Sequence, residues 1–252
     1  MMAKHLRWIP LLLPLSFMAC VGQTYHVEVG PTFARARGVV ALANSSGFLP
    51  VANSLEDDMG LGESEAAPRI AASTRFGDHH VRLSGFYIDT EGSGALNQDY
   101  GNILAGTQVQ NTLDFFAIAG SYSYELEREE NYRLAVGAKL AYYSLDVTAR
   151  SPGGREQVET DALVPMPYIE GEYYWEDLTI GANFGVMSAD LGDATGRYWD
   201  GEAFARYAID DRYDVRVGYR YLLLDGYGRA SSRDFDADLT VQGVYLSAGV
   251  RF

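Results

Sequence analysis

The sequence is poor in the residues that thiol and imidazole chemistry require. It contains one cysteine, at position 20, and only four histidines. A single cysteine cannot close an intramolecular disulfide, and the Cys and His spacings of metal sites are absent. Glycine-rich phosphate loops and serine-centred elbows are absent as well. The sequence therefore predicts a protein that has no cofactor and is not an enzyme.

Basic residues are also few. Lys and Arg together number 20 against 34 Asp and Glu, which gives a formal net charge of −14. Proteins that bind nucleic acid neutralise phosphates with clustered Lys and Arg, and no such cluster occurs in this chain. A nucleic-acid partner is therefore excluded.

Only one long apolar run exists, and it lies at the N-terminus. Residues 8–18 form it, the positive residues Lys4 and Arg7 precede it, and the small residues Ala19, Cys20 and Gly22 follow. The run is shorter than the roughly 20 residues that a membrane-spanning helix needs. We therefore expect residues 1–22 to be a secretory signal peptide and residues 23–252 to be the mature domain.

Cys20 has two possible roles. The segment Phe17-Met18-Ala19-Cys20 resembles the lipobox at which bacterial lipoproteins are cut and acylated, although that pattern usually has Leu where Phe17 stands. The other interpretation is a small residue near the cleavage site. The sequence leaves both open.

From Tyr25 onward the dominant periodicity is two, which is typical of β-strands. The clearest segment is 213–221, in which apolar and polar residues alternate. One face carries Tyr213, Val215, Val217, Tyr219 and Tyr221, and the other carries Asp214, Arg216, Gly218 and Arg220. One face of each such strand is therefore apolar, and the other is charged or contains glycine.

This periodicity predicts an all-β fold with about ten strands, and eight to twelve are possible. The expected strands are 24–34, 67–76, 80–91, 111–126, 132–147, 163–175, 178–189, 196–209, 213–227 and 238–252. Short connections alternate with long ones, and the long ones are 35–66, 92–110, 148–162 and 228–237. Closed antiparallel transmembrane up-and-down barrels show this asymmetry, with short periplasmic turns and long external loops. The first long loop contains apolar stretches, so it either extends its hairpin or folds back over the mouth.

The last strand carries a resemblance to a known group. Segment 244–252 ends on Phe252 and has Val250 and Leu246 at alternate positions before it. This looks like the terminal assembly signal of bacterial outer-membrane barrels, and the mature chain is similar in layout to small OmpA-type and porin-like barrels. Segment 54–65 also resembles an acidic segment of poorly characterised barrels of this kind. The resemblance implies a Gram-negative outer membrane, contact with its lipid and lipopolysaccharide, and periplasmic chaperones and the barrel-assembly machinery as partners.

In such a barrel the charged faces point into the lumen, and charges of both signs are expected to pair there. The expected network comprises Arg69, Arg75, Arg82, Arg133, Lys139, Glu170, Glu172, Glu202, Arg206, Arg216 and Arg220. The same faces carry His26, Glu28, Glu125, Asp200, Asp214 and Arg251. These residues either fill the lumen as a plug of salt bridges or line a narrow path for solutes.

The expected external loops are acidic. Glu56, Asp57 and Asp58 are weak candidates for binding a cation, because the segment lacks the Asp-x-Asp-x-Asp-Gly spacing of a calcium loop. The sequence thus predicts an integral outer-membrane barrel with a salt-bridged polar lumen and a role in envelope structure or in surface interaction through acidic loops. The alternatives are a narrow porin or small-solute channel, and an adhesin-like or cation-binding surface module.

Overall fold

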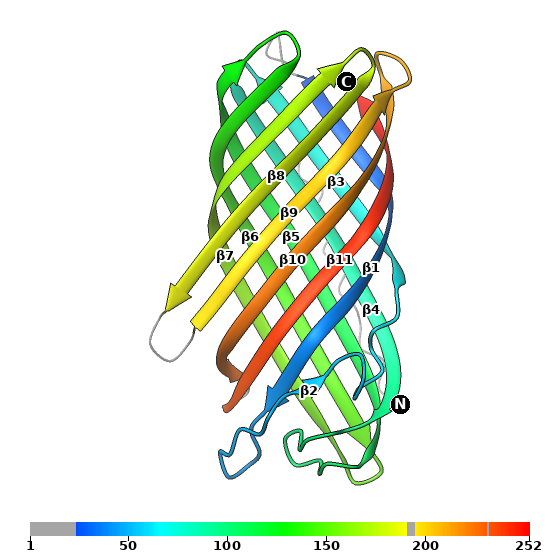
Figure 1. Cartoon of the computed structure of the whole chain (residues 1–252), viewed down its shortest axis with the longest axis vertical. Helices are drawn as coiled ribbons and strands as arrows, with labels where there is room; N and C mark the ends of the chain where they lie inside the picture. The colour runs from blue at the N-terminus through cyan, green and yellow to red at the C-terminus, as the bar shows by residue number, and fades with distance from the viewer. Residues whose placement is uncertain (1–23, 191–194, 231) are drawn as a thin grey trace.

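The computed structural model describes residues 24–190, 195–230 and 232–252, so the expected signal peptide with Cys20 lies outside the described residues. The described part of the chain is a tall barrel of tilted strands (Figure 1). The strands are β1 (Thr24–Leu42), β2 (Asn53–Ser54), β3 (Glu65–Phe76), β4 (His79–Ala95), β5 (Gln108–Arg128), β6 (Tyr132–Ser151), β7 (Gly154–Trp175), β8 (Leu178–Asp190), β9 (Thr195–Ala208), β10 (Tyr213–Ala230) and β11 (Arg233–Arg251).

Ten of these eleven strands close into a ring. Each pairs antiparallel with its neighbours along the chain, and β11 returns to pair with β1 over most of its length. The remaining strand, β2, has two residues and pairs only with the end of β1. The expected closed, ten-stranded antiparallel barrel is therefore confirmed. Within the described residues, no helix is long and apolar enough to cross a membrane.

The apolar faces of the strands point outward. On β10, Val215, Val217 and Tyr219 are between 39% and 48% exposed, whereas Asp214 and Arg216, which alternate with them, are each at most 2% exposed. A soluble protein would place these faces the other way round, because water favours charge on the outside. An apolar exterior around a charged interior is the arrangement that a lipid environment requires.

Both described ends of the chain lie at the end of the barrel that carries the short turns. Tyr25 and Phe252 exchange main-chain hydrogen bonds of 3.3 and 2.9 Å there, and the C-terminus is marked at the top of Figure 1. In the turn between β9 and β10, the Asp210 carboxylate accepts hydrogen bonds from the main-chain N–H groups of Arg212 and Tyr213, and these bonds lower its pKa. We assign this end to the periplasm, since outer-membrane barrels have short turns and both termini on that side.

Two of the expected long loops are strands instead. Residues expected in the loop 148–162 continue β6 to Ser151 and begin β7 at Gly154, and those expected in 228–237 extend β10 and β11. The expectation rested on the loss of apolar alternation. Above the membrane the outward face of a strand meets water, so that face no longer needs apolar residues and the pairing continues without the sequence signal.

The other two long connections fold into the external mouth of the barrel. In the segment 43–64, Leu55, Met59 and Leu61 are at most 2% exposed, and in 96–107 Leu96 and Tyr100 are at most 1% exposed. They join one apolar cluster with inward-facing residues of the barrel wall. The Asn53 side chain links the two segments, because it accepts hydrogen bonds from the main-chain N–H groups of residues 97 and 98 at 3.0 and 2.9 Å. Of the two arrangements open for the first loop, the structure has the one that covers the mouth.

Candidate functional site

The centre of the lumen is crossed by a network of ion pairs around two carboxylates, Glu28 and Glu202. Arg216 joins them, with its Nη1 2.8 Å from a Glu28 oxygen and its Nη2 2.7 Å from a Glu202 oxygen. Arg69 bridges the same two carboxylates at 3.3 and 3.4 Å, and Arg82 does so at 3.7 and 3.4 Å. All five residues face inward from β1, β3, β4, β9 and β10. The network therefore ties together strands from opposite parts of the sequence.

A second group lies nearer the periplasmic end. Arg133 contacts Glu170 at 2.7 Å and Glu172 at 3.5 Å, and Arg75 contacts Glu172 at 2.6 Å. His80 lies 2.8 Å from Glu170 and is buried. His80 is the second residue of β4, which begins at His79, and its side chain is part of the charged interior.

A third group lies on the external side of the central network. Asp200 forms ion pairs with Lys139 at 2.5 Å and with Arg220 at 2.9 Å, and the Tyr143 hydroxyl donates a hydrogen bond to it at 3.2 Å. The Arg220 guanidinium lies 4.6 Å from the centre of the Phe86 ring. From this level outward the interior becomes apolar.

The structure thus brings ten of the eleven residues of the expected network into ion pairs. The exception is Arg206, which has no ion pair to a described carboxylate and donates a hydrogen bond to the Thr179 hydroxyl at 3.3 Å. Glu28 and Asp200 were placed on the inward face but left out of the network. The Tyr245 hydroxyl, which donates to Glu202 at 2.6 Å, was missed because the expected network contained charged side chains only.

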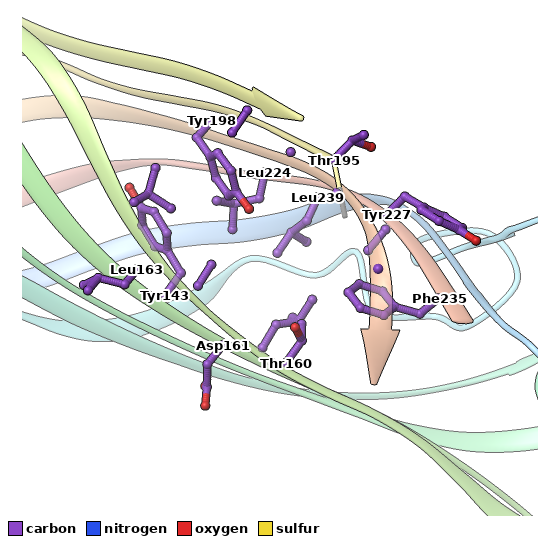
Figure 2. Close-up of a pocket in the computed structure, with 18 of the residues that line it drawn as sticks. Tyr143, Thr160, Asp161, Leu163, Thr195, Tyr198, Leu224, Tyr227, Phe235 and Leu239 are labelled. Atoms are coloured by element: carbon purple, nitrogen blue, oxygen red, sulfur yellow. The ribbon is translucent and has the colours of Figure 1, made fainter. Parts of the chain in front are cut away.

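The external half of the interior is mainly apolar, contrary to the expectation of a polar lumen throughout, although it includes buried polar groups such as Asn111 and Glu156, which forms an ion pair with Arg233. It consists mainly of the apolar cluster described above, but the side chains leave one cavity of about 360 Å³. Figure 2 shows Tyr198, Leu224 and Leu239 on one side of this cavity and Tyr143 and Thr160 on the other. We call it the external cavity. No sequence signal marked it, because it arises where small inward residues such as Gly226 and Ala237 lie directly opposite each other on β10 and β11.

The barrel wall is open beside the external cavity. Pairing between β7 and β8 runs from Trp175↔Leu178 to Tyr168↔Gly185 and ends there. Beyond that point β7 continues to pair with β6, and β8 with β9, so the two strands separate. In Figure 1 the lower, external end of β8 diverges from β7. We call the gap the β7–β8 opening.

Two prolines explain why the pairing ends there. Pro165 and Pro167 lack the main-chain N–H that a ladder needs. The β6–β7 pairing runs without interruption through both positions, so the missing N–H groups are those that would face β8. The last β7–β8 pair is Tyr168↔Gly185. The next main-chain N–H of β7 that would donate a hydrogen bond to β8 is at position 167, where proline has none. The sequence at this point therefore prevents the wall from closing.

The candidate cation ligands have other partners. Glu56 forms an ion pair with Arg37 at 2.8 Å, and the Asp58 carboxylate accepts a hydrogen bond from the Ser54 N–H at 2.7 Å. Asp57 is exposed. Across the described ranges, no group of three or more His, Cys, Asp or Glu side chains is arranged to hold a metal ion.

Comparison with known proteins adds information on the fold. No protein-family model matches the chain, and no curated protein matches it. Among solved structures, it is similar to the outer-membrane protease OmpT from Escherichia coli, with a TM-score of 0.57 and 13% identity over 91% of this chain and 96% of that one. It is also similar to the translocator domain of the autotransporter NalP from Neisseria meningitidis (TM-score 0.45, 11% identity, 91% and 87% covered). A third similar structure is Ail, the attachment invasion locus protein of Yersinia pestis (0.41, 12%, 92% and 99%).

At these identities the OmpT likeness shows the fold and nothing of the activity. The fold is that of an outer-membrane β-barrel. Together with the outward apolar belt and the charged interior, it defines an integral outer-membrane β-barrel protein.

Proposed function

We propose that the protein is a closed outer-membrane barrel that acts through its external end, in envelope structure or in surface interaction, and does not conduct solutes. The observation that supports this proposal most directly is the central network, in which Arg216 is 2% exposed between Glu28 and Glu202. A water-filled path would leave these groups hydrated. The inward-folded segments 43–64 and 96–107 close the external mouth as a second layer.

The external wall has a charge pattern suited to a surface role. Asp89, Asp114, Asp146 and Glu159 are direct cross-strand neighbours on β4, β5, β6 and β7. Like charges placed directly opposite one another destabilise a sheet, so folding alone does not favour this row. A row of carboxylates just above the membrane would attract cationic groups and repel anionic ones.

We infer that the protein is not an enzyme. Histidine is the most frequent general base, and His26 and His80 are buried beside carboxylates at the periplasmic side of the network. His79 is stacked on Phe76 and Tyr122. None of the three lies at the external end, where a surface substrate would bind.

The assembly partners are proposed from the C-terminus. Phe252 is 76% exposed, and Leu246, on the outward face of β11, is 53% exposed, while Val250 is half-buried. A periplasmic receptor could contact this row before the barrel closes. We predict that deletion of Phe252 lowers the amount of assembled barrel, measured as heat-modifiable mobility on gels, while Phe252→Tyr retains it. An unchanged amount after deletion would remove the support for an end signal.

Solute uptake tests the proposed function against the porin alternative. Vesicles that contain the inserted protein should swell in isotonic small sugars no faster than vesicles without it. Swelling at the rate given by an open porin would overturn the proposal, and the central network would then line a path rather than close one.

A further inference from the structure

We propose that the external cavity binds one alkyl chain of a membrane amphiphile, a fatty acid or an acyl lipid, which enters sideways from the outer leaflet through the β7–β8 opening. This goes beyond the surface role and does not depend on it. Three features support the proposal: the position of the opening, the chemistry of the cavity, and the closed floor of the cavity.

The opening lies at the outer edge of the apolar belt. On the outward face of β7, Ile169 and Leu163 are 52% and 64% exposed, and Pro165 and Pro167 between them are exposed as well. The next outward residue is the acidic Asp161. The gap on the external side of Tyr168 therefore begins among residues that face lipid chains. It reaches the level at which the outward face becomes charged.

The cavity itself is reached through this gap. Its lining includes inward residues such as Tyr143, Met187 and Leu224 together with Leu163, whose side chain lies on the outward face of the barrel. One cavity can touch both faces of a strand only where the wall is interrupted. In Figure 2 it lies between the strands that carry Tyr198 and Leu224 and the strand that carries Thr160.

The lining selects an apolar occupant. Most residues of the lining are aliphatic, aromatic or glycine. The two charged ones, Asp161 and Arg229, are exposed and do not belong to the inward face of the barrel. Arg229 forms an ion pair with Asp234 at 2.9 Å. A volume of about 360 Å³ lies at the lower end of the range of ligand pockets, about 300 to 1,000 Å³. This suits a single chain whose polar end stays at the rim.

The floor of the cavity prevents passage through the barrel. Tyr143 lines the cavity and donates its hydroxyl to Asp200, which is held by Lys139 and Arg220. Below this group lies the central network. Moving an alkyl chain through these paired charges would break ion pairs between buried groups, which is costly. The chain can therefore enter and leave only by the side.

The test uses a tryptophan placed in the cavity and lipids with brominated acyl chains, which quench tryptophan on contact. The reporter is Tyr198→Trp, in a background in which Trp175 and Trp199 are replaced by Phe. The matched control is Phe204→Trp, on the same strand and the same inward face but outside the cavity lining. Heat-modifiable mobility checks that each variant is folded. We expect brominated lipid to quench the reporter more strongly than the control. Equal quenching would mean that no chain enters, and would overturn the proposal.

A second pair of variants tests the route. Ala162→Phe and Ala189→Phe each add a ring at one edge of the opening, because both residues line the cavity on the two strands that separate. Ala182→Phe adds the same ring on the exposed, paired part of β8. We expect the first two variants to abolish the excess quenching and the third to retain it. Excess quenching that survives both filled edges would mean access through the mouth, and the sideways route would be wrong.

These outcomes are separate from those of the uptake experiment. Whether the barrel admits sugars does not determine whether the external cavity binds an alkyl chain, so each experiment can succeed or fail independently of the other. Failure of the lipid test therefore leaves the proposed surface role as it stands.

Discussion

The two halves of the barrel interior solve the same packing problem in different ways. The periplasmic half is built from paired charges around Glu28, Glu202, Glu170 and Glu172, and it holds a polar cavity of about 360 Å³ lined by residues such as Arg75 and Glu172. The external half is packed with an apolar cluster that includes the folded-in segments. Charged side chains must meet partners at hydrogen-bond distance, so their positions are tightly specified. Apolar side chains have no such requirement. On the external side, the apolar packing is incomplete at the cavity beside the interrupted wall.

This difference shows why the two halves should respond differently to mutation. Removing one charge leaves several partners buried without compensation, whereas trimming an apolar side chain beside an existing cavity adds little new void. Four experiments test this difference, in order of decreasing expected change in the free energy of unfolding.

The largest effect is expected for Glu202→Leu. This change leaves Arg69, Arg82 and Arg216 with one fewer carboxylate each and removes the acceptor of the Tyr245 hydroxyl. Breaking a buried ion pair from one side costs about 3–5 kcal/mol, which urea unfolding in lipid vesicles would measure. The control is Arg197→Gln on the same strand, because Arg197 is exposed and pairs with Asp225 at the surface. Similar losses for both variants would mean that the network is hydrated.

A substitution on the outward face tests which side of the wall meets lipid. Val217 lies on β10 midway between the exposed aromatics Tyr213 and Tyr221. Val217→Arg should destabilise the barrel by about 2–4 kcal/mol, since that is the cost of arginine near the bilayer midplane. Thr240→Arg, also outward but beyond the belt, should cost much less in the same unfolding experiment. Equal costs would contradict the assigned belt.

Two leucines of the external half compare packed and unpacked parts of the apolar cluster. Leu113 is fully buried in the cluster, and Leu113→Ala should cost about 2–5 kcal/mol because it opens a new void. Leu224 lines the external cavity, and Leu224→Ala should cost less, since the site already has free space. If the second loss matched the first, the cavity would be filled or collapsed in the membrane.

The smallest effect concerns the acidic row. Partial burial, together with the charge of Asp114, raises the pKa of Asp89. A carboxyl whose pKa is raised by folding destabilises the folded state once it ionises, so stability falls as the pH rises from the ordinary pKa of Asp through the raised one. Asp89→Asn should therefore increase the free energy of unfolding at pH 7 by less than about 1 kcal/mol, and should leave it unchanged in acid below the ordinary pKa. A loss of stability at pH 7 would show that a favourable contact of Asp89 outweighs the repulsion.

The sequence predicted the ring and the charged network because both follow from alternation. Period two on β10 specifies which side chains share a face, and the presence of both charges on one face makes pairing necessary. The sequence did not reveal the extended hairpins, since a strand above the membrane has two polar faces and reads as a loop. The external cavity was also hidden. The β7–β8 opening beside it depends on Pro165 and Pro167 facing β8 rather than β6, and only the register of β6 against β7 determines that side.

Single-channel recording of the inserted protein in planar bilayers decides whether paired charges close the lumen, because an ion is the smallest solute that a residual path could pass. We predict that bilayers containing the folded barrel stay silent, without steady conductance steps above the bare membrane. Steady openings that persist in a variant lacking the folded-in segments would contradict the account, because ions would then be passing between Glu28, Glu202 and their arginines.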